Sequence, residues 1–437
     1  MTAERDPSRD VVITGLGVFS PIGIGADAFW NSLAAGKSGI HKVDMPGLAS
    51  PDQVGGAIPE FTEESARKLY LKDHRKNLKA MCREIQLGVA SATQALVDAK
   101  IDLKTIDHER LGVEFGANLM LSTPEILSTA VAACADRAGQ KFEFTDWAPL
   151  GIPKMEPLWL LRYLPNMPAC HISIGSEARG PSNSLTLDDA SGNTVLSEAC
   201  RIIERGAADI MITGVTGTTL HPIKTMHLAL FDDLARTPAE PERRCRPFDL
   251  HRSGRVVAEG TCTLILESRQ HAEARGAKLW GRILGTGMAT FASSQDQPDY
   301  RRALGGAMKA AIRSANLKPA DIGHINAHGV GLQDVDFAES QAIFDVFGPE
   351  TGRTVPVTAL KSYFGNSGAG SGLLELAGSI LGLSHGVIPY TINYETPDPA
   401  CPLNVVAKEP RSTTNKIVLN VNVTRIGQAS AAIVEVF

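Results

Sequence analysis

The sequence predicts an α/β fold with a mainly parallel β-sheet that helices cover on both faces. One observation is the apolar run within residues 208–213. Ile210, Met211 and Ile212 follow one another there, as in a strand buried on both faces. The other is that such runs alternate along the chain with segments of helical periodicity, for example residues 301–316. Strands that alternate with helices are joined by crossovers, which produce parallel pairing.

Composition limits the class of protein further. With 437 residues, 43% of them apolar, and a net charge of −5, the chain can bury a large core as one large domain or two fused ones. No basic run with interleaved aromatic residues suggests nucleic-acid binding. The polar amino terminus and the lack of an apolar run near ~20 residues predict a cytoplasmic protein without a membrane span. Seven scattered cysteines without a Cys-x-x-Cys pair argue against disulfides or zinc, and no cofactor or metal is expected.

The first strand is expected at residues 11–18, before a glycine-rich turn and a helix through Leu33. The Gly-x-Gly pair of this turn is a weak dinucleotide signal, because the third glycine and the later acidic residue are absent. Residues 41–80 are polar and contain Pro and Gly, which predicts a surface loop. An amphipathic helix is predicted at residues 81–99, with an apolar face formed by Ile85, Val89, Ala92, Leu96 and Val97.

A strand at residues 111–117 comes next, followed by a loop and helix at 118–137 and an irregular proline-rich segment at 142–168. The stretch after it predicts strands at 171–174 and 184–187, a helix at 190–205 and the strand at 208–213. A strand at 262–266 and a short helix at 270–275 complete this half. The second half predicts strands at 281–285, 322–327, 355–358, 417–423 and 431–437, and helices at 301–316, 336–347 and 373–383.

Asp189 lies where a strand turns sharply into the helix at 190–205. The free N–H groups of a helix amino terminus favour a negative charge or a thiolate. This stretch resembles the nucleophile segment of the β-ketoacyl-acyl-carrier-protein synthases, and matching Ser191-Gly192 to the Ser-Gly after the family's cysteine puts Asp189 at the cysteine position. The resemblance implies a thiolase-like fold in which two duplicated βαβ halves, residues 10–268 and 276–437, form a five-layer αβαβα architecture.

The condensing chemistry of that family needs a thiolate nucleophile, two basic side chains and backbone donors for an oxyanion. His328 stands in an Asn-Ala-His-Gly segment like the one that carries the family's first base. Lys361 matches a family lysine, but Asn366 replaces the histidine five residues later. The family's carboxy-terminal Gly-Phe-Gly-Gly-Thr-Asn gate keeps only Gly427. The resemblance therefore implies a chain that retains the fold and has lost condensation by itself.

Residues 172–174, 179–182 and 185–190 are similar to chain-length factors, the β subunits of type II polyketide synthases. This resemblance implies pairing with an active ketosynthase α subunit, or with a second copy, and binding of acyl carrier protein. It places residues 182–187 at a two-fold interface. It also places three small or medium side chains near the gate that closes the tunnel for the growing chain, namely Thr123, Ile126 and Ala130.

Two other functions stay open at this point. His328 and Asn366 could polarise a thioester carbonyl and make the chain a malonyl-carrier-protein decarboxylase that supplies a starter unit, or the chain could be a homodimeric scaffold for carrier protein. Each site residue also has a purely structural explanation. Asp189 could cap its helix, worth about 1 kcal/mol; His328, Lys361 and Asn366 could hold loops; and the three gate residues could pack their own helix.

Overall fold

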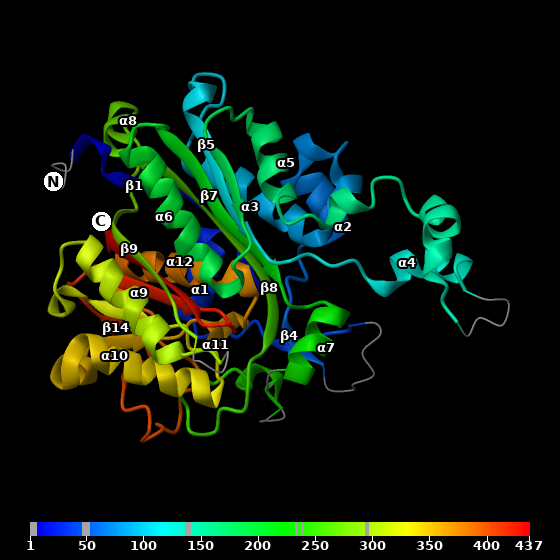
Figure 1. Cartoon of the computed structure of the whole chain (residues 1–437). Coiled ribbons are helices and arrows are strands. Elements are labelled where there is room, and N and C mark those ends of the chain that lie inside the picture. The colour runs from blue at the N-terminus through cyan, green and yellow to red at the C-terminus, as the bar shows by residue number, and fades with distance from the viewer. Residues whose placement is uncertain (1–6, 46–52, 136–140, 232–233, 237–239, 293–296) are drawn as a thin grey trace.

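The computed structural model describes residues 7–45, 53–135, 141–231, 234–236, 240–292 and 297–437, which form a layered body and one projecting extension (Figure 1). Helix α4 (Pro124–Ala133) lies on that extension. The last residues of the helix predicted at 118–137 fall outside the described residues. Among the residues described, no helix combines the length and apolar character that a membrane span requires.

Eleven strands form one sheet path, in the order β13-β11-β10-β15-β16-β9-β1-β8-β7-β5-β6. The two halves of the path meet where β1 pairs with β9 over two residues only. The amino-terminal half contains β1 (Val11–Ser20), β5 (Leu111–Ala117), β6 (Ser182–Leu185), β7 (Ile210–Thr218) and β8 (Val257–Ser268). The carboxy-terminal half contains β9 (Gly281–Thr290), β10 (His324–Asn326), β11 (Pro356–Thr358), β13 (Asn404–Val405), β15 (Ile417–Val423) and β16 (Gln428–Val436).

The prediction of mainly parallel pairing is wrong for the centre of this path. Strands β13, β11, β10 and β15 run parallel, and so do β7, β5 and β6. The pairs between β15 and β7 are all antiparallel. One reason is visible between β15 and β16, where only residues 424–427 connect the strands, too few for the crossover that parallel neighbours require.

Helices form three layers around the two halves of the sheet (Figure 1). Helix α3 (Arg83–Asp98) covers β1 and β8, and α9 (Tyr300–Ser314) covers β9 and β16. Between the two halves lie α6 (Ser191–Glu204) and α12 (Ser371–Ser384), which contact strands of both. Residues 371–383 of α12 are all buried, as expected of a helix in a central layer. The result is the predicted thiolase-like fold with five layers.

Two predictions about the amino-terminal half are wrong. Residues 171–174 belong to helix α5 (Met167–Ser176) and not to a strand; an alternation over four residues is too short to separate the two structures. Of the surface loop predicted at 41–80, residues 46–52 lie outside the described residues, and the rest is partly core, because Ile58, Phe61 and Leu71 are fully buried in the cluster beneath β1 and α3. The ring of Phe61 meets that of Phe19 edge-to-face at 5.6 Å.

Helix α3 buries the predicted face with one exception. Ile85, Val89 and Ala92 are buried, whereas Val97 is 72% exposed. The buried stripe continues through Ala95, three residues after Ala92, so Val97 is turned away from the sheet. The remaining helices and short strands are α1 (Ala26–Ala34), α2 (Glu63–Ser65), α7 (Pro222–Phe231), α8 (Arg269–Ala274), α10 (Gln333–Thr354), α11 (Lys361–Phe364), β2 (Gly23–Ile24), β3 (His41–Lys42), β4 (Val54–Gly56), β12 (Val387–Ile388) and β14 (Arg411–Ser412).

Candidate functional site

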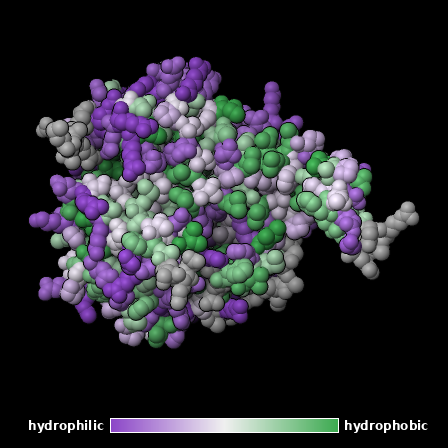
Figure 2. Space-filling model, in the orientation of Figure 1, coloured by the Kyte–Doolittle hydropathy of each residue, from purple (hydrophilic) through white to green (hydrophobic). Residues whose placement is uncertain are grey.

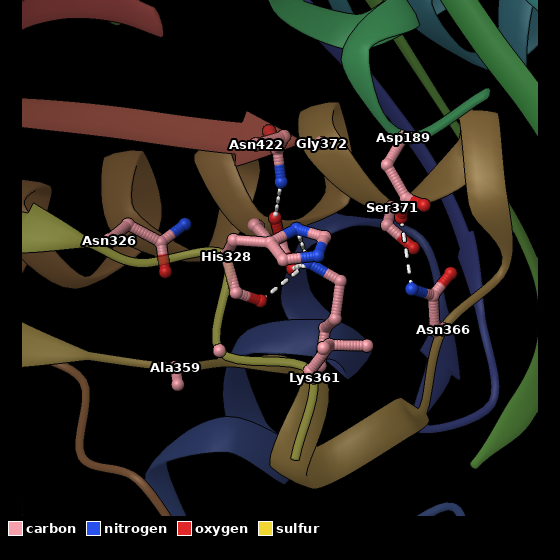
Figure 3. A network of polar contacts seen from close by, with 12 residues as sticks. Asp189, Asn326, His328, Ala359, Lys361, Asn366, Ser371, Gly372 and Asn422 are labelled. Atoms are coloured by element: carbon pink, nitrogen blue, oxygen red, sulfur yellow. Dashed lines mark hydrogen bonds and ion pairs between the residues drawn. The ribbon is translucent and has the colours of Figure 1, made fainter. Parts of the chain in front are cut away.

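Asp189 lies in a single turn of 3-10 helix directly before α6, and its side chain is buried. The residue that caps α6 is Ala190, and no side chain caps that helix, so the capping explanation for Asp189 is wrong. Instead Asp189 Oδ1 accepts a hydrogen bond of 2.9 Å from Asn366 Nδ2 (Figure 3). The carboxylate therefore faces a side chain from the second half of the chain.

Asn366 follows α11 and Gly365, whose φ of 80° makes the sharp turn that brings the amide back toward α6. Its backbone pairs with the strand region at residues 256–258, with Asn366 N donating to Val256 O at 2.8 Å. Its side-chain Oδ1 accepts a 2.6 Å hydrogen bond from Gly368 N. With both ends of the amide bound, Asn366 has one side-chain N–H left for another partner.

His328 follows strand β10, and Glu339 holds its backbone by accepting from His328 N at 2.7 Å and from Gly329 N at 2.9 Å. Burial, together with the nearby charges of Lys361 and Arg255, keeps the pKa of His328 well below its usual value. The imidazole is therefore neutral at pH 7. Its Nδ1 lies 3.4 Å from Lys361 Nζ, so Nδ1 is the acceptor and Nε2 carries the proton.

Lys361, the first residue of α11, is fully buried, and its Nζ donates to His328 O at 2.8 Å. The same ammonium group forms an ion pair with Glu375 of α12, whose Oε2 accepts from Asn422 Nδ2 at 2.7 Å. Burial raises the pKa of Glu375 to about 7, and the ion pair opposes that rise. Sequence analysis missed Glu375, although a lone acid in an otherwise apolar helix signals a buried partner.

Four buried asparagines connect this ion pair to α6. Asn193 of α6 donates to Asn422 Oδ1 at 3.1 Å and accepts from Asn420 Nδ2 at 2.8 Å. Asn326 of β10 donates to Asn420 Oδ1 at 2.8 Å. These hydrogen bonds connect α6, α12, β10 and β15. They fix the elements that carry His328 and Asp189 relative to one another.

Comparison with known proteins shows the family to which the chain belongs. The β-ketoacyl synthase N-terminal domain matches residues 8–272 and the β-ketoacyl synthase C-terminal domain matches residues 281–395. The chain is a β-ketoacyl synthase family member. It is 30% identical over 417 residues to 3-oxoacyl-[acyl-carrier-protein] synthase 2 of Synechocystis, covering 94% of each chain.

Solved structures of ketosynthases have the same fold. The ishigamide ketosynthase/chain length factor superposes with a TM-score of 0.83 at 27% identity, over 98% of this chain and 99% of the other. A type II polyketide synthase acyl-carrier protein in complex with its ketosynthase gives a TM-score of 0.84 at 25% identity, over 99% and 100% of the two chains. These relatives support a role of the ketosynthase family in polyketide or fatty-acid biosynthesis.

The loop of this ketosynthase-family chain that matches the family's gate is a tight connection between β15 and β16. Gly427 has a φ of 78°, and its N–H donates to Thr424 O at 3.0 Å. Arg425 matches the family's phenylalanine, and Ile426, which matches the first of its two adjacent glycines, is 62% exposed. The guanidinium of Arg425 lies over the ring of Phe231 at 5.6 Å, which draws this loop toward α7. The position of the family's phenylalanine therefore carries a cation, which lies against α7.

The predicted tunnel residues lie apart from the buried network. Ala130 is buried, Thr123 is half-buried at the start of α4, and Ile126 is exposed. Helix α4 packs against the turns at residues 147–151 and 152–154 of the same extension, away from the layered body (Figure 1). A gating role for these residues therefore requires a second chain against the extension.

Proposed function

We propose that the chain is a condensation-incompetent ketosynthase homologue that acts as a chain-length-factor-like subunit. The observation that carries this proposal is the buried hydrogen bond between Asp189 and Asn366, at the positions of the family's nucleophile and second base. A carboxylate attacks a thioester poorly, and the anhydride it would form hydrolyses readily. An amide cannot accept the proton or provide the positive charge of an imidazole.

The proposed partner is a ketosynthase that carries the catalytic cysteine, and the proposed substrate carrier is acyl carrier protein. The names of the structural relatives support both, since one is a ketosynthase/chain length factor and another a ketosynthase with its carrier protein. Strand β6 also supports a partner, because it is the last strand of the sheet path and Ser182 and Asn183 are exposed. An open edge of this kind is a place where another chain adds a strand.

The direct test is reconstitution. The chain, purified alone, should form no ketoacyl product from acyl- and malonyl-carrier protein, and it should support product formation when co-purified with a cysteine-bearing ketosynthase encoded beside it. The control is the same complex with that ketosynthase's cysteine changed to alanine. Condensation by the chain alone would contradict the proposal.

A decarboxylase activity is the second candidate, and the protonation of His328 favours it. With its proton on Nε2, the neutral imidazole can donate a hydrogen bond to a thioester carbonyl, and Asn366 has one N–H to add. The assay is carbon dioxide release from malonyl-carrier protein by the chain alone. A structural subunit releases none; release that disappears in His328→Ala identifies the decarboxylase. A homodimer that binds carrier protein and performs neither reaction would indicate a scaffold.

The tunnel-gate proposal gives a prediction for product length. We expect Thr123→Phe, in the complex with the ketosynthase, to shorten the product by at least one extension at similar yield, because a larger side chain fills the space of the last methylenes. Ala130→Phe should act in the same direction, although Ala130 is buried within the extension and overpacking there costs roughly 1–3 kcal/mol.

Thr129→Phe is the matched control, because Thr129 is an exposed residue of the same helix. Product length is measured by mass spectrometry of the released chains. Unchanged length in both Thr123→Phe and Ala130→Phe would refute the gate.

A further inference from the structure

Glu114 is a buried acid for which the ketosynthase chemistry has no use. It lies in β5, next to the edge strand β6, with a side chain that is 0% exposed. Its Oε1 accepts only a long hydrogen bond of 3.4 Å from Asn183 Nδ2, and its Oε2 has no partner among the described residues. Buried carboxylates are normally paired with a cation or several donors, so this acid lacks its usual partner.

A second acid increases the negative charge at this place. Burial and the charge of Glu198, on α6, raise the pKa of Glu114 to about 7. Arg201 forms an ion pair with Glu198 at 3.0 Å, but on the exposed side of the helix, and Glu114 itself forms no ion pair within the described part of the chain. Without a cation beside it Glu114 is therefore partly protonated at pH 7, and a cation placed against its unpartnered oxygen would stabilise the charged form.

The unpaired carboxylate lies beside the open edge of the sheet. Asn183, its register partner on β6, is exposed, and the described strand path ends there. Neighbouring strands are about 4.8 Å apart, so a strand added to β6 would lie about 10 Å from β5, within reach of an Arg or Lys side chain. An added chain can therefore place a cation against Glu114.

Apolar surface accompanies this edge. Figure 2 shows it gathered on the face between α5 and α7, on the side from which the extension projects. Ile174 of α5, a helix that packs against β6, is 65% exposed. An exposed large apolar side chain beside an open sheet edge is consistent with a partner that covers both.

We propose that the chain bound at β6 is a different polypeptide that places an Arg or Lys against Glu114 and Glu198, and that a second copy of this chain binds there only weakly. This inference rests on the proposed function, and it adds the charge that the ketosynthase partner must carry at this edge. In the complex the partner's cation supplies the donor that Glu114 Oε2 lacks.

Symmetry is the reason why a second copy fits poorly. A two-fold interface that pairs β6 with the β6 of a second copy keeps the two β5 strands about 14 Å apart, so each copy would have to supply the cation from its own β6. Strand β6 contributes Ser, Asn, Ser and Leu, none of which is cationic. Arg179 precedes the strand, so antiparallel pairing of two copies would carry it beyond the opposite end. A second copy therefore leaves Glu114 Oε2 without a cation from the described residues of β6.

The test compares Glu114→Gln, Glu198→Gln and the wild-type chain for binding to the co-expressed ketosynthase and for self-association, both by sedimentation. Glu109→Gln is the matched control, since it removes one exposed carboxylate just before the same strand. We expect each of the two test variants to weaken binding to the ketosynthase by about tenfold or more, and the control to leave it unchanged. Glu198 lies on a helix surface, so Glu198→Gln tests the charge requirement even if Glu114→Gln disturbs folding.

The outcomes separate this inference from the proposed function. A complex whose affinity is the same in all four proteins overturns the charge requirement while leaving the pairing intact. A wild-type homodimer as tight as the complex overturns it too. Failure of any cysteine-bearing ketosynthase to bind the wild-type chain refutes the proposed function itself.

Discussion

Glu375→Leu is expected to lower the free energy of unfolding by about 3–5 kcal/mol at pH 7, because it leaves the Lys361 ammonium buried without its counter-charge. Both side chains are fully buried, and Lys361 Nζ has His328 O, at 2.8 Å, as its other oxygen partner. Asn422 Nδ2 also loses the acceptor that it has at 2.7 Å. Urea unfolding followed by circular dichroism measures the change.

A double variant distinguishes the ion pair from simple packing. Lys361→Met together with Glu375→Leu removes both charges while keeping the volume, and such replacements of buried pairs are often neutral. We therefore expect the double variant to recover most of the stability lost in Glu375→Leu. Glu273→Leu, at an exposed position of α8, is the surface control and should change stability by less than about 0.5 kcal/mol. A double variant no more stable than Glu375→Leu would refute this account.

Asp189→Cys is expected to leave the isolated chain without detectable condensation. The new thiol would lie beside the Asn366 amide, whose Nδ2 is 2.9 Å from Asp189 Oδ1, where the family has its second histidine. One positioned acid or base contributes about 10²–10⁴-fold to a rate, so the missing histidine alone keeps the reaction far below that of an active ketosynthase. The gate loop also keeps Arg425 and Ile426 where the family has its phenylalanine and a glycine.

The measurement is ketoacyl product formed from acyl- and malonyl-carrier protein without a partner. Asp189→Asn is the control for folding, because it retains the size of the side chain and its place beside Asn366. Adding Asn366→His to Asp189→Cys should raise the rate above that of the single variant, since it returns the second base to the place of the amide. Ketoacyl product from Asp189→Cys alone would contradict the prediction.

Much of the fold could be predicted from local pattern. The strands at 111–117 and 417–423 have the predicted bounds, and the helices at 81–99, 190–205, 301–316 and 373–383 are present with small shifts at their ends. These elements carry long periodic runs of apolar residues, whose burial does not depend on knowing the neighbour. The segments around Asp189, His328 and Lys361 could likewise be matched to a family, because each motif is contiguous in the chain.

What the sequence by itself determined is therefore the family and the main elements, and it gives the match of Asp189 to the family's cysteine on which the proposed function depends. Only the tertiary structure decided that residues 171–174 are helical, that residues 41–80 are partly core, and that Glu375 is the partner of Lys361. It also decided that Asn366 binds Asp189 from 177 positions away and that, among the residues the structure describes, Glu114 has no cation as a partner. Pairings of this kind depend on how sheets and helices stack, and local periodicity holds no information about residues that are distant in sequence.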